Sequence, residues 1–404
     1  MTKLFSRHRR RCAAAILASL TALTLATPSQ ANAASRVRAT PEPACSRHAG
    51  TKNALRVLTQ TYGLAGAAVD ASGPTCGGWN ASSGVADLRT GRAMRADERI
   101  RIGSTTKTFT ATVVLQLAAE GRIALDTPVE RYLPGVVQGN GYDGRRMTVR
   151  ALLQHTSGMP DHVDALDWDS LPEWRYRKFT PDELVALALG QPHPDRSWTY
   201  STTNYVLAGM IVERITGHPI GAEITRRIIR PLGLRDTYWP GNSPYIRGPH
   251  PRGYYPANLD PASTDPAGDP QPKLDLTDVN MSFGDAGGAL ISSLSDENRF
   301  FAALFDGRLV SLRYLRQMMT TVEADPDRVW PGARYGLGLI STPLRRCGVD
   351  LYWGHGGTTP GFKTLGGITP DGRRVQLVIN DTITSQEAYD ALTAAVHTAL
   401  CETE

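Results

Sequence analysis

Ser104 and Lys107 stand three residues apart at the start of an apolar run, residues 108–119, that predicts a helix. Residues at this spacing share one helical face, so the lysine amine is expected beside the serine hydroxyl. The free N–H groups and the positive dipole end at a helix start also favour negative charge on a nearby oxygen. The segment therefore predicts a serine activated for acylation. Alone, the Ser-x-x-Lys spacing is common, and it equally fits a serine N-cap beside a solvated lysine.

Two later segments carry residue types that suit the same chemistry. Tyr200, Ser201 and Thr202 precede a helix-like run over residues 204–216, which Gly217 closes. The sequence His-Gly-Gly-Thr at 355–358 follows an apolar stretch that predicts the end of a strand. The glycines of this segment have no Cβ, so they would let the strand pass close to a substrate.

In this order and spacing, Ser-x-x-Lys, Tyr-Ser-x and His-x-Gly form the pattern of the penicillin-recognising serine hydrolases. The chain resembles their class C β-lactamase-like branch, in particular the exocellular D-alanyl-D-alanine carboxypeptidases and transpeptidases. Four further segments look like family segments and extend the resemblance over nearly the whole chain after residue 33. These segments are residues 84–87, 152–158, 286–292 and 335–339.

The resemblance implies that Ser104 attacks a carbonyl to form an acyl-enzyme, while Lys107 and Tyr200 share the proton transfers. A lysine with an ordinary pKa is protonated at neutral pH, so Lys107 must be desolvated or paired with another proton carrier to act as a base. The backbone N–H groups of Ser104 and Thr358 would form an oxyanion hole. The implied substrate-binding residues are Thr202, Phe283, His355, Gly357 and Thr358.

Several positions depart from the family pattern. His355 stands where many β-lactamases carry lysine, and it can donate a hydrogen bond and be cationic or neutral near pH 7. Thr202 replaces an asparagine and cannot offer the paired donor and acceptor of an amide. Phe283 stands where close relatives have a tryptophan over the cleft.

The departure with the largest consequence is Ile340, which stands where carboxypeptidase relatives place an arginine near the terminal carboxylate of the substrate. Arg345 and Arg346 are candidate replacements, because a guanidinium can bind a carboxylate with two hydrogen bonds. His155 lies in a Leu-Leu-x-His-Thr-Ser-Gly segment that recurs in the family as a structural turn, and we assign it that role.

Strand-like and helix-like runs predict an α/β (α+β) fold, and the resemblance implies that it is of the β-lactamase/transpeptidase-like type. Its mainly antiparallel sheet is formed from both chain ends and flanked by helices, with an inserted all-helical domain. The expected strands are 66–69, 76–88, 335–340, 351–353, 364–368 and 375–379, and the expected terminal helices are 53–61 and 386–400. The predicted divisions are a signal peptide (1–33), a first α/β part (34–130), a helical domain (131–275) and a second α/β part (276–404). The Pro-rich segment 241–272 is expected as a surface loop, and the active site is expected between the two lobes.

Residues 1–33 read as a secretory signal peptide, with five basic side chains, an apolar run over 13–26 and a small-residue cleavage site, Ala-Asn-Ala, at 31–33. The precursor carries a formal charge of +5, and these residues hold five basic and no acidic side chains, so the rest of the chain is formally neutral. We therefore expect a secreted (extracellular) protein with no membrane anchor and no nucleic-acid partner.

Cys12 leaves with the signal, and the four remaining cysteines are expected to form disulfides in an oxidising compartment. Three pairings are possible. The resemblance favours Cys347–Cys401, which leaves Cys45–Cys76. No Cys-x-x-Cys or His-Glu-x-x-His spacing occurs, so neither a metal nor another cofactor is expected.

The leading hypothesis is a serine-type D-alanyl-D-alanine carboxypeptidase that acts on peptidoglycan stem peptides or other D-amino-acid peptides, with β-lactams as covalent inhibitors. A β-lactamase would form the same acyl-enzyme and differ in fast deacylation. An esterase, a D-aminopeptidase or a peptide-cyclising acyl transferase on the same fold stays open, because the usual carboxylate and amide contacts are missing. A penicillin-binding sensor with little or no turnover is the non-enzymatic alternative.

Overall fold

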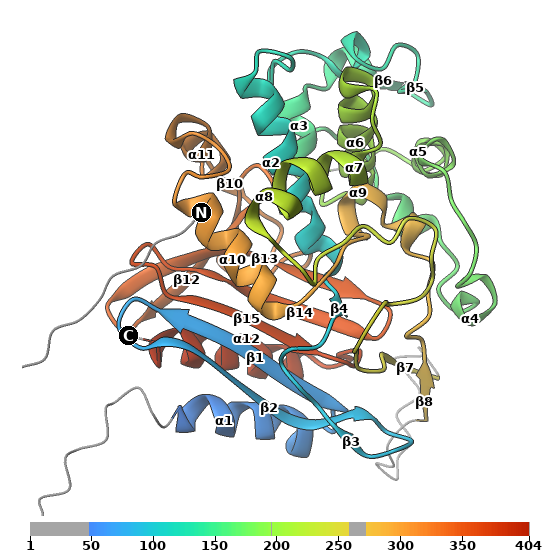
Figure 1. Cartoon of the computed structure of the whole chain (residues 1–404). Coiled ribbons are helices and arrows are strands. Elements are labelled where there is room, and N and C mark those ends of the chain that lie inside the picture. Colours follow the sequence, from blue (N-terminus) through green and yellow to red (C-terminus); the bar gives the residue numbers. More distant parts are fainter. Residues whose placement is uncertain (1–47, 195, 258–271, 404) are drawn as a thin grey trace, which may run out of the picture. The chain divides into compact units, whose positions relative to one another are not determined.

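Both ends of the chain contribute strands to one antiparallel sheet in the computed structural model, which describes residues 48–194, 196–257 and 272–403 (Figure 1). The nine strands lie in the order β10-β11-β12-β13-β14-β15-β1-β2-β3. Strand β1 pairs with β15, so early and late segments meet inside the sheet. This confirms the predicted antiparallel sheet. The strand bounds are β1 Gly66–Gly73, β2 Gly77–Asp87, β3 Arg92–Ala93, β10 Val322–Glu323, β11 Arg334–Tyr335, β12 Ile340–Arg346, β13 Val349–Thr359, β14 Phe362–Ile368 and β15 Arg374–Ile379.

Helices bury both faces of this sheet (Figure 1). Along β1, Val69 belongs to an apolar cluster shared with α1 and α12, and its neighbour Ala68 belongs to the cluster on the opposite face. Successive strand residues point to opposite faces, so the central strands are apolar on both sides. The helices are α1 Ala49–Arg56, α2 Thr106–Ala119, α3 Val149–Gln154, α4 Leu171–Trp174, α5 Pro181–Leu189, α6 Thr202–Thr216, α7 Ile220–Ile224, α8 Arg230–Leu232, α9 Asp285–Gly288, α10 Leu294–Phe305, α11 Leu312–Met318 and α12 Gln386–Cys401.

Helix α2 is buried on nearly all sides, which explains its lack of a polar face. Its threonine hydroxyls are satisfied inside the protein: Thr108 donates to the carbonyl of Gly338 and Thr110 to that of Ala286, each at 2.7 Å. A buried hydroxyl without such a partner would destabilise the fold. Helix α2 is therefore held firmly between the sheet and the other helices, and it carries Lys107 at its first turn.

Three local predictions were wrong. Residues 335–340 do not form one strand: β11 ends at Tyr335, and the Gly336 N–H donates to the Leu339 carbonyl (2.7 Å) in a turn before β12. The His-Gly-Gly-Thr segment does not lie at a strand end, because β13 continues through it. The predicted loop 241–272 contains a strand, β7 (Tyr254–Pro256), which pairs with β8 (Lys273–Asp275).

Helices are the principal regular elements of residues 131–275 where they are described, but this segment also holds two short strand pairs, β7 with β8 and β5 (Gln138–Gly139) with β6 (Tyr142–Asp143). A further pair, β4 (Ile100–Arg101) with β9 (Ile291–Ser292), lies outside this segment. The predicted domain boundaries stay predictions. Within the described ranges, none of the helices combines the length and the apolar character that crossing a membrane requires.

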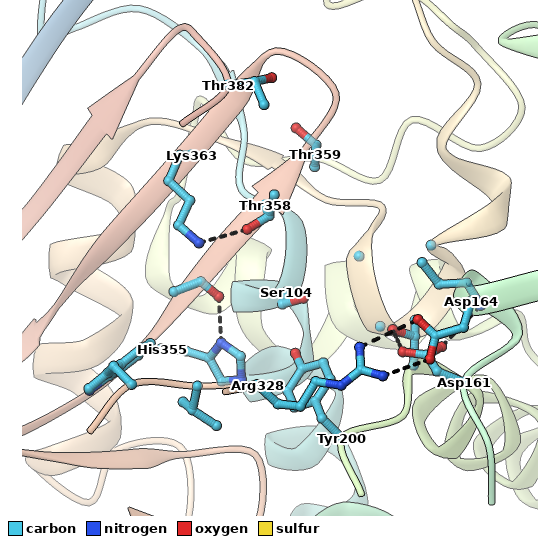
Figure 2. Close-up of a pocket in the computed structure, with 18 of the residues that line it drawn as sticks. Ser104, Asp161, Asp164, Tyr200, Arg328, His355, Thr358, Thr359, Lys363 and Thr382 are labelled. Carbon is cyan, nitrogen blue, oxygen red and sulfur yellow. Dashed lines mark hydrogen bonds and ion pairs between the residues drawn. The ribbon is translucent and has the colours of Figure 1, made fainter. Parts of the chain in front are cut away.

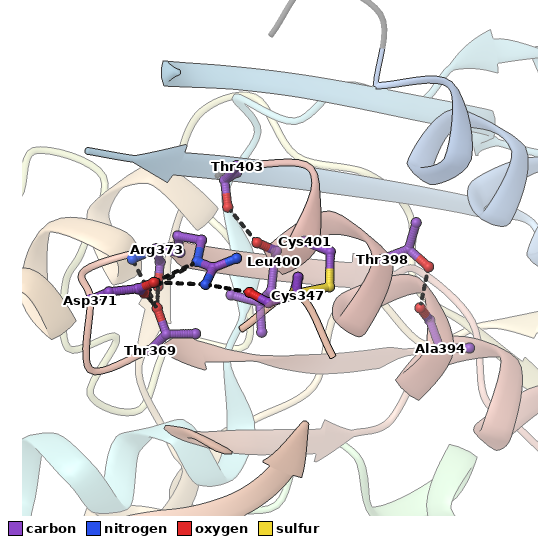
Figure 3. The surroundings of a disulfide bond; sticks show 9 residues. All are labelled: Cys347, Thr369, Asp371, Arg373, Ala394, Thr398, Leu400, Cys401 and Thr403. Carbon is purple, nitrogen blue, oxygen red and sulfur yellow. Dashed lines mark hydrogen bonds and ion pairs between the residues drawn. A yellow bond between two sulfur atoms is a disulfide. The ribbon is translucent and has the colours of Figure 1, made fainter. Parts of the chain in front are cut away.

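The predicted disulfide Cys347–Cys401 is present and joins the turn between β12 and β13 to the last residue of α12 (Figure 3). The buried Arg373 supports the same turn, since its guanidinium donates to the Cys347 carbonyl (2.9 Å) and pairs with Asp371 (2.6 Å). The predicted signal peptide (1–33) and Cys45 lie outside the described residues. The pairing of Cys45 with Cys76 stays a prediction.

Candidate active site

The predicted serine and lysine lie side by side at the start of α2. Ser104 occupies a short 3₁₀ turn, Gly103–Thr105, that leads directly into the helix. The Lys107 Nζ lies 3.2 Å from the Ser104 Oγ and donates to the Gly287 carbonyl at 2.9 Å. The spacing of one helical turn thus brings the amine against the hydroxyl, as the sequence predicts.

Lys107 is fully buried, and no carboxylate of the described residues lies within ion-pair distance of its amine. Desolvation therefore lowers the pKa of Lys107 to about 7, although the nearby Asp161 carboxylate acts in the opposite direction. Near neutral pH a large fraction of the amine is uncharged. An uncharged amine 3.2 Å from a hydroxyl can accept its proton.

Tyr200 lies next to the same pair, with its ring centroid 4.9 Å from the Lys107 Nζ. Burial raises the pKa of Tyr200 above its ordinary value, while a hydrogen bond with Ser104 acts in the opposite direction. The Tyr200 phenol therefore stays protonated near neutral pH. It can donate this proton to another group only if it receives a proton in the same step.

His155 contacts the segment that carries Tyr200 and does not line the cavity. It ends α3 in the left-handed conformation (φ 62°), and its Nδ1 accepts the Ser201 N–H at 3.1 Å. Its ring packs 4.4 Å from that of Tyr200, between centroids. The position matches the structural turn that the sequence predicts.

His355 is held as a neutral imidazole inside β13. Its Nδ1 contacts the Gly356 carbonyl at 2.6 Å, and its Nε2 contacts the Tyr335 hydroxyl at 2.9 Å. A carbonyl only accepts hydrogen bonds, so the proton lies on Nδ1 and the Tyr335 hydroxyl donates to Nε2. Burial and the Lys107 charge lower the pKa of His355 to about 3. The neutral form is thus present near pH 7, and its one N–H is already used within the strand.

Gly357 is not among the residues that line the cavity, and its predicted contact with substrate stays a prediction. A Cβ at this position would meet the Ile102 carbonyl oxygen at 2.0 Å, so the glycine lets the strand pass close to Ile102. The next residue, Thr358, lies close to the start of α2. A Cβ on Gly103 would lie 2.9 Å from the Thr358 amide nitrogen. The Thr358 backbone therefore lies beside Ser104, as the predicted oxyanion hole requires.

A cavity of about 820 Å³ opens over these residues (Figure 2). Five of the predicted residues besides Ser104 line it: Tyr200, Thr202, Phe283, His355 and Thr358. Phe283 is nearly buried and packs edge-on against Trp168 and Trp174, at centroid distances of 5.7 and 5.6 Å. Phe283 and Trp168 therefore form an aromatic wall of the cavity.

The sequence interpretation missed several charged residues of the cavity. Thr202 donates to the Asp161 carboxylate at 3.2 Å, so the position that lost its asparagine faces a buried acid. Arg328 pairs with Asp164 at 2.9 Å, and Lys363 donates to the Thr358 hydroxyl at 2.8 Å. Asp161 follows the predicted turn after His155 by only a few residues, and Lys363 lies across a short hairpin from Thr358. Nearness to a motif was thus the signal that could have found both.

Arg345 and Arg346 do not replace the missing arginine. Both are exposed at the far end of β12, next to Cys347, and neither lines the cavity, whereas Ile340 does. No group of three or more His, Cys, Asp or Glu side chains that could hold a metal ion occurs among the described residues.

Comparison with known proteins identifies the family of the chain. The family model described as Beta-lactamase matches residues 52–398. The esterase EstB of Burkholderia gladioli is 36% identical over 171 residues, which are 38% of this chain and 42% of the esterase. The putative penicillin-binding protein PbpX of Bacillus subtilis (strain 168) is 26% identical over 284 residues, which are 69% of this chain and 61% of that protein. The chain thus spans less than two thirds of these curated relatives.

Among solved structures, a D-stereospecific amidohydrolase from Streptomyces sp. is 38% identical, with a TM-score of 0.76, and the match covers 86% of this chain and 98% of that one. The shared fold includes the large antiparallel sheet and the helices described above. The family match covers most of the chain, and the chain belongs to the β-lactamase family of serine hydrolases, with penicillin-binding-protein homologues.

Proposed function

We propose that the protein is a secreted hydrolase of the D-alanyl-D-alanine carboxypeptidase type, which forms an acyl-enzyme on Ser104 with peptides that contain D-amino acids, such as peptidoglycan stem peptides. The observation that carries this proposal is the buried Lys107 amine, which lies 3.2 Å from the Ser104 hydroxyl and has no ion-pair partner among the described residues. The 38% identity to a D-stereospecific amidohydrolase supports the choice of D-configured substrates.

In this proposal, the Ser104 Oγ bonds to the substrate carbonyl carbon and gives its proton to the neutral Lys107 amine. The backbone N–H groups of Ser104 and Thr358 stabilise the resulting oxyanion. The carbon–nitrogen bond then breaks as Tyr200 protonates the leaving amine and regains a proton from Lys107. Water attacks the ester by the reverse proton route, which releases the acid and restores the Ser104 hydroxyl.

Hydrolysis of N-acetyl-D-Ala-D-Ala and of its L,L isomer by the chain from residue 34 onward tests the proposal. We expect release of D-alanine from the D,D isomer alone. Ser104→Ala should lower kcat by a factor on the order of a thousand or more, since the nucleophile is removed. Ser197→Ala, an exposed serine that does not line the cavity, is the matched control and should behave like the wild type. Equal activity of the Ser104 variant would reject the mechanism.

The Asp161 carboxylate favours a second candidate, a D-aminopeptidase or D-amino-acid amidase. Asp161 is a buried acid that lines the cavity and accepts a hydrogen bond from Thr202, so it could pair with a free α-ammonium group of a substrate. D-Alaninamide and its N-acetylated form separate the two candidates. Cleavage of the free amine alone would favour the second, and cleavage of neither amide nor dipeptide would reject both.

Export is part of the proposal. Expression of the full chain in a bacterium with a Sec pathway should give a processed protein outside the cytoplasm whose first residue is Ala34. An unprocessed protein retained in the cytoplasm would contradict this prediction.

A further inference from the structure

We propose that Lys363 is the specificity-determining residue that binds a substrate carboxylate. It would take the place of the arginine expected at position 340, where this chain has Ile340. The inference rests on the proposed function and names the group that would select peptides with a free C-terminus.

Strand pairing places Lys363 at the oxyanion-hole end of the site. Lys363 on β14 lies opposite Thr358 on β13, and its Nζ donates to the Thr358 hydroxyl at 2.8 Å. Figure 2 shows Lys363 on the same side of Ser104 as Thr358, Thr359 and Thr382. Because the Thr358 backbone lies against Gly103, the residue before Ser104, the amine that contacts the Thr358 hydroxyl lies at this end of the site.

The charge on Lys363 has no acidic partner among the residues that the structure describes. In the described part of the chain, no carboxylate lies within ion-pair distance of its amine, which instead contacts the Tyr389 ring at 4.8 Å from the centroid. One of the three N–H donors of a lysine is used on Thr358, so two remain for a ligand. The buried Thr359 hydroxyl, which also lines the cavity, has no hydrogen-bond partner within the described ranges.

The other cation that lines the cavity is already neutralised. Arg328 pairs with Asp164 at 2.9 Å and lies on the opposite side of Ser104 from Lys363 (Figure 2). A substrate carboxylate near Arg328 would therefore compete with an acid that is already bound. Desolvation lowers the pKa of Lys363 to about 8, so the amine is still mainly protonated at neutral pH.

Calorimetric binding to the Ser104→Ala protein tests this subsite without turnover. The probes are N-acetyl-D-Ala-D-Ala and its C-terminal amide, which differ only in the terminal group, a charged carboxylate or a neutral amide. We expect the acid to bind at least about tenfold more tightly than the amide, as charge-assisted hydrogen bonds allow. Adding Lys363→Met should bring the ratio near one, whereas Lys363→Arg should preserve it. Lys178→Met, at an exposed lysine that does not line the cavity, is the matched control and should leave the ratio unchanged.

The pH dependence gives a second readout that a merely structural lysine would not produce. The preference for the acid should fall as pH rises through about 8, because Lys363 then loses its charge. A ratio near one in the Ser104→Ala protein, no binding of either probe, or a ratio that survives Lys363→Met would overturn the inference. Hydrolysis by the wild type tests the proposed function separately. If the wild type hydrolyses the peptide but the acid-to-amide binding ratio does not depend on Lys363, only the subsite is rejected. If binding is selective but the wild type does not hydrolyse the peptide, only the proposed activity is rejected.

Discussion

At the scale of single residues, burial decides the protonation state of the basic groups around Ser104. Desolvation is the largest cause of the lowered pKa values of Lys107, His155 and His355, and the two histidines are lowered further by the Lys107 charge. Like charges so close together cannot all be ionised. The histidines are therefore neutral near pH 7, and Lys107 remains as the group that titrates there.

This predicts the direction of the pH dependence. The pKa of Lys107 is lowered from 10.5 to about 7, so the amine is basic above this pH and protonated below it. Acylation by a neutral ester should rise with pH and level off above about 7, which a rapid-mixing pH profile would measure. Lys107→Met should lower the rate by a factor on the order of 100 or more, as expected for loss of a general base. The exposed Lys52→Met is the control, and an inflection near 10 would contradict the argument.

At the scale of the elements, the end of a helix can often be predicted from a glycine that follows it. Helix α6 ends at Gly217, whose φ of 75° lies in the left-handed region, as the predicted glycine stop requires. Helix α5 also ends at a glycine, Gly190, but its φ is −75°, which any residue adopts. Two glycines in the same kind of position therefore differ in whether glycine is needed.

Substitution by alanine should separate them. Gly217→Ala has open space for its Cβ but must adopt a positive φ, so we expect a loss of about 1 kcal/mol in the free energy of unfolding. Gly190→Ala meets only ordinary contacts and should be neutral or stabilising by up to about 1 kcal/mol. Urea denaturation of both variants measures the difference, and equal effects would show that the left-handed conformation is not the cause.

At the scale of the whole molecule, contacts between residues far apart in the sequence join the two ends of the chain into one sheet. Strand β1 pairs with β15, and the disulfide joins the β12–β13 turn to α12 across 54 residues of sequence. Neither cysteine lines the cavity, so the bond supports the sheet rather than the chemistry.

Removal of both sulfurs tests whether the disulfide supports the stability of the sheet and not the chemistry at Ser104. Cys347→Ala/Cys401→Ala should lower the free energy of unfolding by about 2–4 kcal/mol, because the unfolded chain loses a cross-link. The rate of acylation by a neutral ester should stay within about twofold of the wild type below the unfolding transition, since the change lies outside the cavity. Denaturation and ester kinetics on the same samples check both, and a collapse of the rate in the folded variant would be the contrary result.

The sequence by itself determined the class of chemistry, the helices that begin near Ser104 and Thr202, most strands of the sheet and, through family resemblance, the disulfide. These features depend on residues within a few positions of one another, or on motifs whose order is preserved. Only the tertiary structure decided that His355 is neutral, that Gly357 faces Ile102, and that Arg328 pairs with Asp164 at the cavity. Desolvation, close backbone approach and charge pairing arise between segments far apart in the chain, so no local pattern of residues contains them.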